Sequence, residues 1–397
     1  MTKILERFLL LLLLLLLPTQ LGYHFWPSWS LVHGIRVDYL SPTIYLTDLI
    51  ILGLFFLSRF RVSVPLPVLI FATLNILISY SPNIAIYSWL RLLEYFWFFK
   101  YLSFRFYWIL NIGHWTLSLS IFWTSLLAWM QFLKQASIGG PLYWLGERTF
   151  NISTPGIAKI SFAGHLLLRP YATLPHPNAL AGFLLIAGLI IYYLNSQKKL
   201  VIGHWSLVIV ALTVPITFSR TAIVLEILVL VSWICSKIKN LKYKIIFFVL
   251  CIIPSSLLMI QFSGSPDSLP LRLALNQKAL QAIKQNPLLG LGLGNFIPAT
   301  SSYQLQTTNY QLITQPVHNI YLLAASELGL PATVIIIYLI IKKIKNSLNI
   351  EYWILNIAAL VVLTTGLADH YWLTLHQNIL LLVILISLIK VQFMPTE

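Results

Sequence analysis

The feature that most constrains this chain is a series of long apolar segments separated by short loops rich in lysine and arginine. Of its 397 residues, 58% are hydrophobic and 9% are charged. Each segment approaches the roughly 20 residues that a helix needs to cross a bilayer. The pattern excludes an ordinary soluble domain and predicts an all-α membrane protein with about twelve transmembrane helices.

The predicted spans cover most of the chain, and the loops between them are too short for a second domain of ordinary size. The spans are residues 8–21, 43–58, 65–80, 84–99, 107–133, 178–194, 200–218, 221–235, 245–262, 318–341, 352–367 and 378–389. We therefore expect residues 1–397 to form a single polytopic membrane domain. Lys3 and Arg7 before the first span are also compatible with a signal peptide, but no small-residue cleavage site follows, and we expect an uncleaved anchor.

Basic residues predict the orientation of the spans. Lysine and arginine gather in every second connection, from Lys3 near the start to Lys390 near the end, and short basic loops face the cytoplasm. Both termini are then cytoplasmic. The formal net charge of +15 lies largely in these loops, so we expect a lipid bilayer around the chain and no direct binding of nucleic acid.

Two longer connections fall on the opposite, extracytoplasmic side. The larger is residues 263–317, between the ninth and tenth helices, and the smaller is residues 134–177. In the larger loop, the apolar spacing of residues 271–285 predicts a helix lying on the membrane surface or over a site. The three glycines of segment 290–294 are expected to form the turns that return the loop to the membrane.

Two arginines on this side are candidates for binding an anion. Arg220 stands in a single polar corner between two apolar spans, where a charge is costly unless it serves a partner. A snorkelling anchor is the alternative for Arg220, but positive charge is disfavoured on this side by the orientation rule. Arg272 stands at the start of the predicted surface helix, and taken alone it would be an ordinary surface residue.

His318 begins the tenth span directly after the large loop, with Asn319 beside it. The positive end of the helix dipole favours a neutral imidazole at this position, and a neutral imidazole can accept a proton. Taken alone, His318 is more simply read as a capping or interfacial histidine.

Further polar residues mark the same side of the membrane. They are Arg169, His176 and Asn178 before the sixth span, Asp48 near the outer end of the second span, and Asp369 with His370 after the eleventh. His176 and Asn178 could bind substrate or only shape the start of a helix. Arg91 and Glu94, three residues apart in the fourth span, predict a structural ion pair. No set of metal ligands is visible on the outer side.

Four motifs, in this order, resemble the O-antigen ligase and polymerase superfamily of bacterial membrane glycosyltransferases. They are Arg169-Pro with His176-Pro-Asn, Ser219-Arg-Thr-Ala, Arg272 followed by Asn286-Pro-Leu-Leu-Gly-Leu-Gly, and His318-Asn with Glu327-Leu-Gly. The resemblance covers roughly residues 169–369. Ala172 and Pro331 depart from the family by standing where glycine is common, and neither touches the expected chemistry.

The resemblance implies an inverting transfer of a glycan from an undecaprenyl-diphosphate carrier to an acceptor hydroxyl, at the outer face of the inner (plasma) membrane, without metal or cofactor. By motif, Arg220 and Arg272 would bind the diphosphate and His318 would be the base. Arg169, His176, Asn178, Asn319, Asp48 and Asp369 remain candidates for binding substrate or shaping the site.

The acceptor stays open among a lipid, a glycan and a protein. A ligase acting on lipid A core ranks first because of the His-Asn and Ser-Arg motifs. A repeat-unit polymerase and an O-oligosaccharyltransferase follow. A transporter or flippase is the non-enzymatic alternative, but transporters place their sites near the midplane, often within repeated halves. Here the polar residues gather at one face and no repeat is evident.

Overall fold

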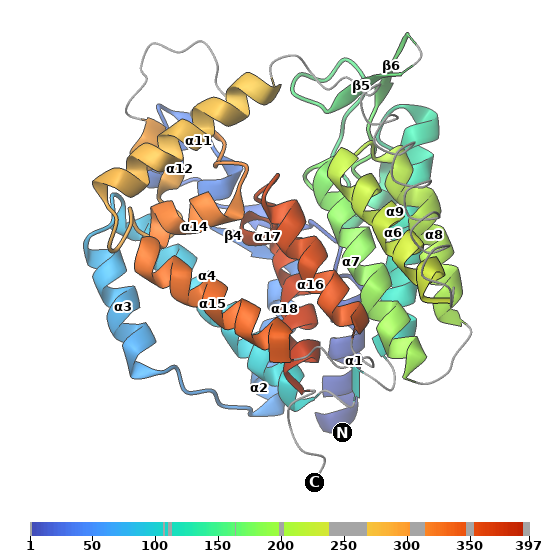
Figure 1. The fold of residues 1–397 in the computed structure, drawn as a ribbon, viewed down its shortest axis with the longest axis horizontal. Coiled ribbons are helices and arrows are strands. Elements are labelled where there is room, and N and C mark those ends of the chain that lie inside the picture. Colours follow the sequence, from blue (N-terminus) through green and yellow to red (C-terminus); the bar gives the residue numbers. More distant parts are fainter. Residues whose placement is uncertain are drawn as a thin grey trace.

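The computed structural model describes residues 2–105, 108–109, 113–162, 164–197, 202–237, 268–301, 314–346 and 353–391. Within these residues the fold is a helical bundle with a few short strands (Figure 1). The helices are α1 (Thr2–Leu15), α2 (Leu46–Ser58), α3 (Leu66–Leu77), α4 (Pro82–Phe104), α6 (His114–Lys134), α7 (Pro177–Ser196), α8 (Ile202–Ile216), α9 (Arg220–Lys237), α11 (Ser268–Gln285), α12 (Phe296–Ser301), α14 (Ile320–Leu328), α15 (Leu330–Asn346), α16 (Trp353–Gly366), α17 (Tyr371–Thr374) and α18 (His376–Val391).

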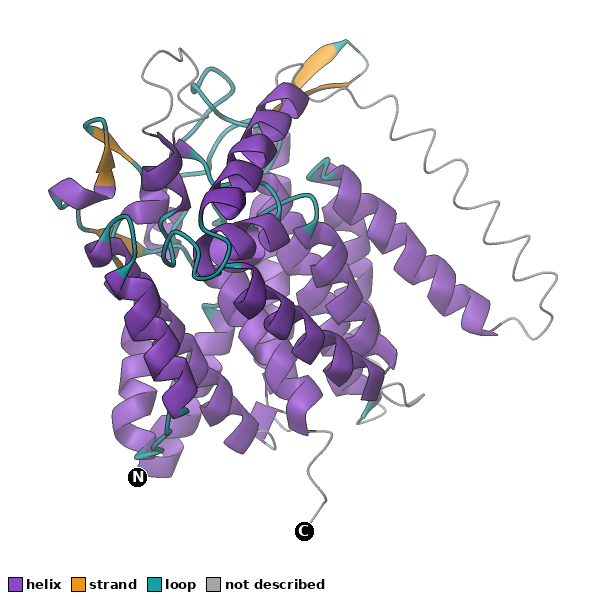
Figure 2. Ribbon diagram, turned by 60° about the vertical axis from the view of Figure 1, so that its left-hand side comes forward, coloured by secondary structure: helices purple, strands orange, loops and turns teal. Residues whose placement is uncertain are grey.

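The strands pair as three small antiparallel hairpins or ribbons, which lie in the smaller predicted extracytoplasmic loop, between the first two predicted spans, and at the first residues of the second predicted span. They are β1 (Gly22–His24) with β4 (Thr43–Tyr45), β2 (Leu31–Val32) with β3 (Ile35–Arg36), and β5 (Lys159–Phe162) with β6 (His165–Leu168). A short 3₁₀ turn, η2 (Asp38–Leu40), lies between β3 and β4. Figure 2 shows the strands at one end of the bundle, while α1 starts and α18 finishes toward the other.

Helix α7 is the centre of the bundle. Nearly all of its residues are buried, and it packs against α6, α8, α9, α16 and α18. A helix that is apolar all round is expected in such a position. A side chain at Gly182 would collide with the ring of Tyr371, so glycine allows the short helix α17 to lie directly on α7. The site described below is carried by the ends of these packed elements.

The outside of the bundle is apolar. Exposed leucine, isoleucine and valine side chains follow α3 and α15, among them Leu66, Ile70, Leu77, Ile335 and Leu339. A soluble monomer rarely exposes apolar patches of this extent. The exterior is consistent with a protein surrounded by lipid.

Hydropathy located the helices well. Every predicted span overlaps a helix of the structure, except residues 245–262, which lie outside the described residues, and several differ from the helix by up to seven residues at one end, as where α1 ends at Leu15. In the part of the chain that the structure describes, α6 and α7 are long and apolar enough to cross a membrane by length and composition, and the other apolar helices are shorter. The number of crossings and their orientation therefore stay predictions.

The predicted tenth span is not one helix, which corrects the sequence analysis. It is broken between α14 and α15 at Gly329, whose φ is +81°. The loop after α11 inserts its backbone there: Leu330 N donates to Pro287 O at 2.8 Å and Leu291 N donates to Ser326 O at 2.8 Å. These bonds satisfy the groups that the break would leave unpaired.

The glycines of segment 290–294 do form turns, as predicted. Gly290, Gly292 and Gly294 all have positive φ. A Cβ at Gly290 would collide with the backbone of Glu327, so glycine is needed where this loop docks against α14. The predicted surface helix is α11, and through this loop it is tied to α14.

Candidate functional site

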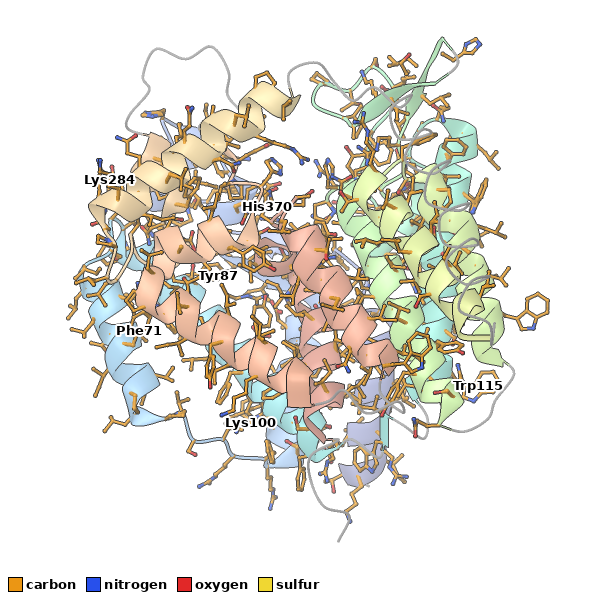
Figure 3. All side chains as sticks on the ribbon, viewed as in Figure 1. Phe71, Tyr87, Lys100, Trp115, Lys284 and His370 are labelled. Atoms are coloured by element: carbon orange, nitrogen blue, oxygen red, sulfur yellow. The ribbon has the colours of Figure 1, made fainter. Side chains whose placement is uncertain are left out.

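The polar side chains predicted for the extracytoplasmic side meet where α7, α14 and α17 begin. Asn178 belongs to the first turn of α7, His318 lies just before α14, and Asp369 and His370 lie between α16 and α17. Figure 3 shows His370 on the strand-bearing side of the molecule, far from Lys100 at the end where α1 starts. Residues separated by up to about two hundred positions are thus brought into one cluster.

A continuous line of hydrogen bonds runs through this cluster. Arg169 Nη2 donates to Asn178 Oδ1 at 2.6 Å, and Asn178 Nδ2 donates to Asp369 Oδ2 at 2.9 Å. The amide of Asn178 is therefore fixed in orientation, because its oxygen must face the guanidinium and its NH₂ group must face the carboxylate. Asp369 is held in place from this side.

Asp369 faces His318 with its other oxygen. Asp369 Oδ1 lies 3.5 Å from His318 Nδ1 and accepts the backbone N–H of His370 at 2.8 Å. The Nδ1 to Oδ1 distance is longer than an ordinary hydrogen bond. On the far side of the ring, His318 Nε2 lies 3.3 Å from Gln315 Oε1. The imidazole thus has a carboxylate on one side and an amide oxygen on the other.

Arg272 is delivered to the same place by α11. Its Nη1 donates to the carbonyl oxygen of Ala368 at 3.0 Å, directly before Asp369. Leu271 and Leu275 on the same helix share an apolar cluster with Val37 and Leu40 at the turn η2. Arg272 is held beside the cluster, and its remaining guanidinium N–H groups are not used by this bond.

Arg220 begins α9, after a sharp corner. The preceding Phe218 has a φ of +52°, a costly conformation for a residue with a side chain. Arg169 Nε donates to the carbonyl of Thr217 at 2.7 Å and so secures this corner. Arg220 itself is exposed, and its guanidinium makes no hydrogen bond or ion pair to the residues that the structure describes. Arg169 therefore supports both Arg220 and, through Asn178, Asp369.

The electrostatics of the cluster favour neutral histidines beside an ionised carboxylate. Burial, reinforced by Arg169, lowers the pKa of His176 to about 3, and burial with nearby cationic groups lowers the pKa of His370 to about 3. Burial works to raise the pKa of Asp369, but the side-chain contact with His318 holds it well below its usual range. Burial together with Arg220 and Arg272 lowers the pKa of Arg169 to about 10, so it remains a cation at neutral pH.

Two predicted residues have structural duties. His176 is the N-cap of α7, where its Nδ1 accepts the N–H of Asn178 at 3.1 Å. Asn319 is the N-cap of α14, where its Oδ1 accepts the N–H groups of Tyr321 and Leu322. The helix thus begins at Ile320, two residues later than the prediction that His318 starts it. Both side chains shape the site by fixing helix ends.

Asp48 does not join the cluster, which corrects its candidacy. It lies in a separate network between α2, α4 and α18, where Arg91 Nη1 contacts Asp48 Oδ2 at 2.8 Å and Glu94 Oε2 at 2.7 Å. The predicted pair of Arg91 with Glu94 is confirmed. Arg91 Nη2 also reaches Nδ1 of His376 at 2.6 Å and the hydroxyl of Tyr95 at 3.0 Å. Asp48 contacts Arg91 and His376 because its side of α2 faces α4 and α18.

Sequence reasoning missed several neighbours of the cluster. Tyr39 in η2 packs edge-on against His370 with ring centroids 5.3 Å apart, and Thr374 Oγ1 lies 2.7 Å from His370 Nδ1. Gln315 Oε1 lies 3.3 Å from His318 Nε2. None of these three residues has a neighbour in the sequence that signals its role. Only the packing of η2 and α17 brings them to the histidines.

The structure also changes the expectation about metal ligands. His318, Asp369 and His370 each offer one donor atom, and these atoms lie within 4.8 Å of one another. The set was invisible in the sequence because its members come from two distant segments. Metal independence of the reaction remains a prediction.

Comparison with known proteins supplies one match. Residues 205–337 match the family model described as O-Antigen ligase. The matched region runs from α8 into α15 and contains Arg220, Arg272 and His318. No curated protein matches the chain.

Proposed function

The chain belongs to the O-antigen ligase and polymerase superfamily, and from this premise we propose that it transfers a glycan from an undecaprenyl-diphosphate carrier to an acceptor hydroxyl at the extracytoplasmic face of the cell membrane. Members of this family are glycosyltransferase-like membrane enzymes. The observation that carries the proposal is the meeting of Arg272, Asp369 and His318 at one point of the fold.

The two arginines bind the diphosphate in this proposal. Arg220 is exposed and has no hydrogen-bond partner among the described residues. Arg272 uses one of its N–H groups to donate to the carbonyl of Ala368. Guanidinium groups contact phosphate oxygens bidentately and keep their charge at any physiological pH. They therefore stabilise the negative charge that grows on the departing diphosphate without requiring a metal ion.

His318 acts as the general base. Asp369 Oδ1 accepts a hydrogen bond from Nδ1–H when the two side chains close from 3.5 Å, which leaves a lone pair on Nε2 for the acceptor hydroxyl. As that oxygen attacks the anomeric carbon, its proton passes to Nε2 and the bond between the anomeric carbon and the diphosphate oxygen breaks. Attack from the side opposite the leaving group inverts the anomeric configuration.

A transfer assay tests the proposal with purified protein in detergent. A chemically defined undecaprenyl-diphosphate oligosaccharide is offered with lipid A core, with a second lipid-linked repeat unit, or with a peptide acceptor. We expect product in the presence of excess chelator, with the anomeric configuration inverted by NMR. A retained configuration, or activity that appears only after a divalent ion is restored, would contradict the chemistry. The acceptor that reacts separates ligase, polymerase and protein transferase.

A further inference from the structure

The protonation of His370 can be read from its neighbours. Thr374 Oγ1 donates its single hydrogen to the carbonyl of His370, with an oxygen separation of 3.1 Å. The same oxygen lies 2.7 Å from His370 Nδ1, so while its hydrogen is donated to the carbonyl it accepts a hydrogen bond from Nδ1–H. Nε2 of His370 is left with a free lone pair.

The resting state of His318 follows from the same reasoning. Gln315 Oε1, 3.3 Å from Nε2, can only accept a hydrogen, so it favours the tautomer that carries the proton on Nε2. Nδ1 then presents a lone pair to Asp369 Oδ1 at 3.5 Å, and it has no hydrogen-bond partner although it is buried. Two atoms with lone pairs thus face each other at 3.5 Å, an arrangement that is stabilised by a positive charge bound to both, either a proton or a metal ion.

We propose that His318, Asp369 and His370 form a binding site for Zn²⁺, and that zinc bound there inhibits transfer. The zinc-binding part of this proposal stands on the three side chains alone, whereas the inhibition rests on the proposed function of His318 as base. Zinc bound to Nδ1 fixes the proton on Nε2, where it is donated to Gln315. The metal thus locks the tautomer opposite to the one that the transfer requires.

The donor set is suited to zinc. Two imidazole nitrogens and one carboxylate oxygen are a common three-ligand set for Zn²⁺, which leaves a fourth position for water. Tetrahedral zinc with bonds of about 2.0–2.2 Å separates its ligand atoms by about 3.4 Å, close to the 3.5 Å between His318 Nδ1 and Asp369 Oδ1. The third donor lies within 4.8 Å and needs only a side-chain adjustment. Mg²⁺ and Ca²⁺ prefer sites made of oxygen and are not expected to bind.

Two further features bear on the strength of binding. Thr374 holds the second nitrogen of His370 in the way that outer partners orient zinc-binding histidines. The side chain of His318 is 17% exposed, which provides an entry path from the outer side. Arg272 donates a hydrogen bond to the carbonyl of Ala368, the residue before Asp369, and its positive charge opposes a bound cation. The site is therefore expected to take zinc from solution reversibly.

Zinc binding is measured first, by titrating ZnCl₂ into purified full-length protein and counting bound metal by equilibrium dialysis. We expect one specific site. His370→Gln should weaken it by at least about tenfold, and Thr374→Val by about tenfold to a hundredfold because the outer partner is lost. His165→Ala removes an exposed histidine on β6 and serves as the matched control, with binding unchanged. Equal binding by the wild type, His370→Gln and Thr374→Val would overturn the site.

Inhibition is measured second, as the ratio of transfer rates with and without ZnCl₂ in each protein. We expect zinc to inhibit the wild type and His165→Ala at the concentration that fills the site, and to inhibit Thr374→Val only at about tenfold to a hundredfold higher concentration. MgCl₂ should have no effect. Zinc that fills the site without slowing transfer would leave the metal site standing and overturn both its inhibitory role and the assignment of His318 as base.

Discussion

The molecule contains two polar clusters built from the same kinds of residue, and they differ in how completely their groups are paired. In the network of Arg91, Asp48, Glu94 and His376, the guanidinium contacts two carboxylates, an imidazole and a tyrosine hydroxyl, all within 3.0 Å. At the outer cluster, Arg220 has no partner among the described residues, and His318 Nδ1 has no hydrogen bond.

The difference in pairing separates a structural role from a chemical one. The network of Arg91 holds α2, α4 and α18 together and commits its guanidinium to internal partners, and Asp48 Oδ1, which accepts no hydrogen bond from the described residues, lies 3.1 Å from His376 Nε2. At the outer cluster, the buried Nδ1 of His318 is costly while it is unpaired, and such groups are retained where a ligand supplies the missing partner. The comparison predicts that mutations in the two clusters fail in different assays.

The largest effect is expected at the open arginines. Arg220→Ala and Arg272→Ala should each lower transfer by about 10³-fold or more, because the charge on the departing diphosphate loses its stabilisation. Lysine at either position should restore little, since it lacks the bidentate fork. Arg148→Ala, at an exposed arginine of the same side, is the control. Transfer rates are compared after confirming that the variants have equal unfolding temperatures. Full activity in Arg220→Lys would contradict bidentate binding of the diphosphate by Arg220.

Breaking the network of Arg91 should instead cost stability. Arg91→Ala leaves Asp48 and Glu94 without their shared cation, and because these side chains are only partly buried we expect the free energy of unfolding to fall by less than the about 3–5 kcal/mol typical of a fully buried pair. Thermal unfolding in detergent measures the loss, and turnover per folded molecule should change little at permissive temperature. An unchanged midpoint with a selective loss of turnover would show that this network takes part in the reaction.

Mutation of Asn178, which joins Arg169 to the carboxylate facing His318, should lower the transfer rate by an intermediate amount. Asn178→Ala removes the amide that joins Arg169 to Asp369, and a hydrogen bond to a charged group is worth about 1.5–3 kcal/mol. Transfer should fall by about tenfold to a hundredfold with donor affinity nearly unchanged. A large rise in the donor Kd would mean that Asn178 contacts the donor directly.

Much of the fold was predictable because hydropathy is a local property. The α7 and α11 segments were recognised from their own residues, and the turns of segment 290–294 from their glycines. The break at Gly329 was not recognised, because it exists only where the loop after α11 donates and accepts hydrogen bonds at that point. The hydropathy of residues 318–341, taken alone, shows one continuous apolar run.

The site was predictable to the extent that its residues stand in motifs. Arg272, His318 and Asp369 were named, and the structure brings them together. Asp48 was misplaced because a polar residue near a helix end looks the same whether it faces a site or a neighbouring helix. Thr374 and Tyr39 were missed because their role depends on His370 packing beside them.

The smallest effect concerns pH and stability. Burial lowers the pKa of His370 to about 3, against about 6.5 in an unfolded chain. Below pH 6.5 the unfolded state binds a proton that the folded state refuses, so the free energy of unfolding falls by up to about 1.4 kcal/mol per pH unit. Unfolding midpoints between pH 7 and 5 should fall less steeply in His370→Gln than in the wild type. Parallel slopes would contradict a neutral buried imidazole.

The central claim is that the outer cluster binds the donor with its arginines and performs chemistry with His318. Donor affinity and single-turnover transfer rates of the wild type, His318→Ala and the control His165→Ala test it most directly. We predict that His318→Ala binds the lipid-linked donor as tightly as the wild type and transfers about 10² to 10⁴-fold more slowly, while the control is unchanged. A His318→Ala protein that transfers at the normal rate, or that loses donor binding instead, would contradict the account.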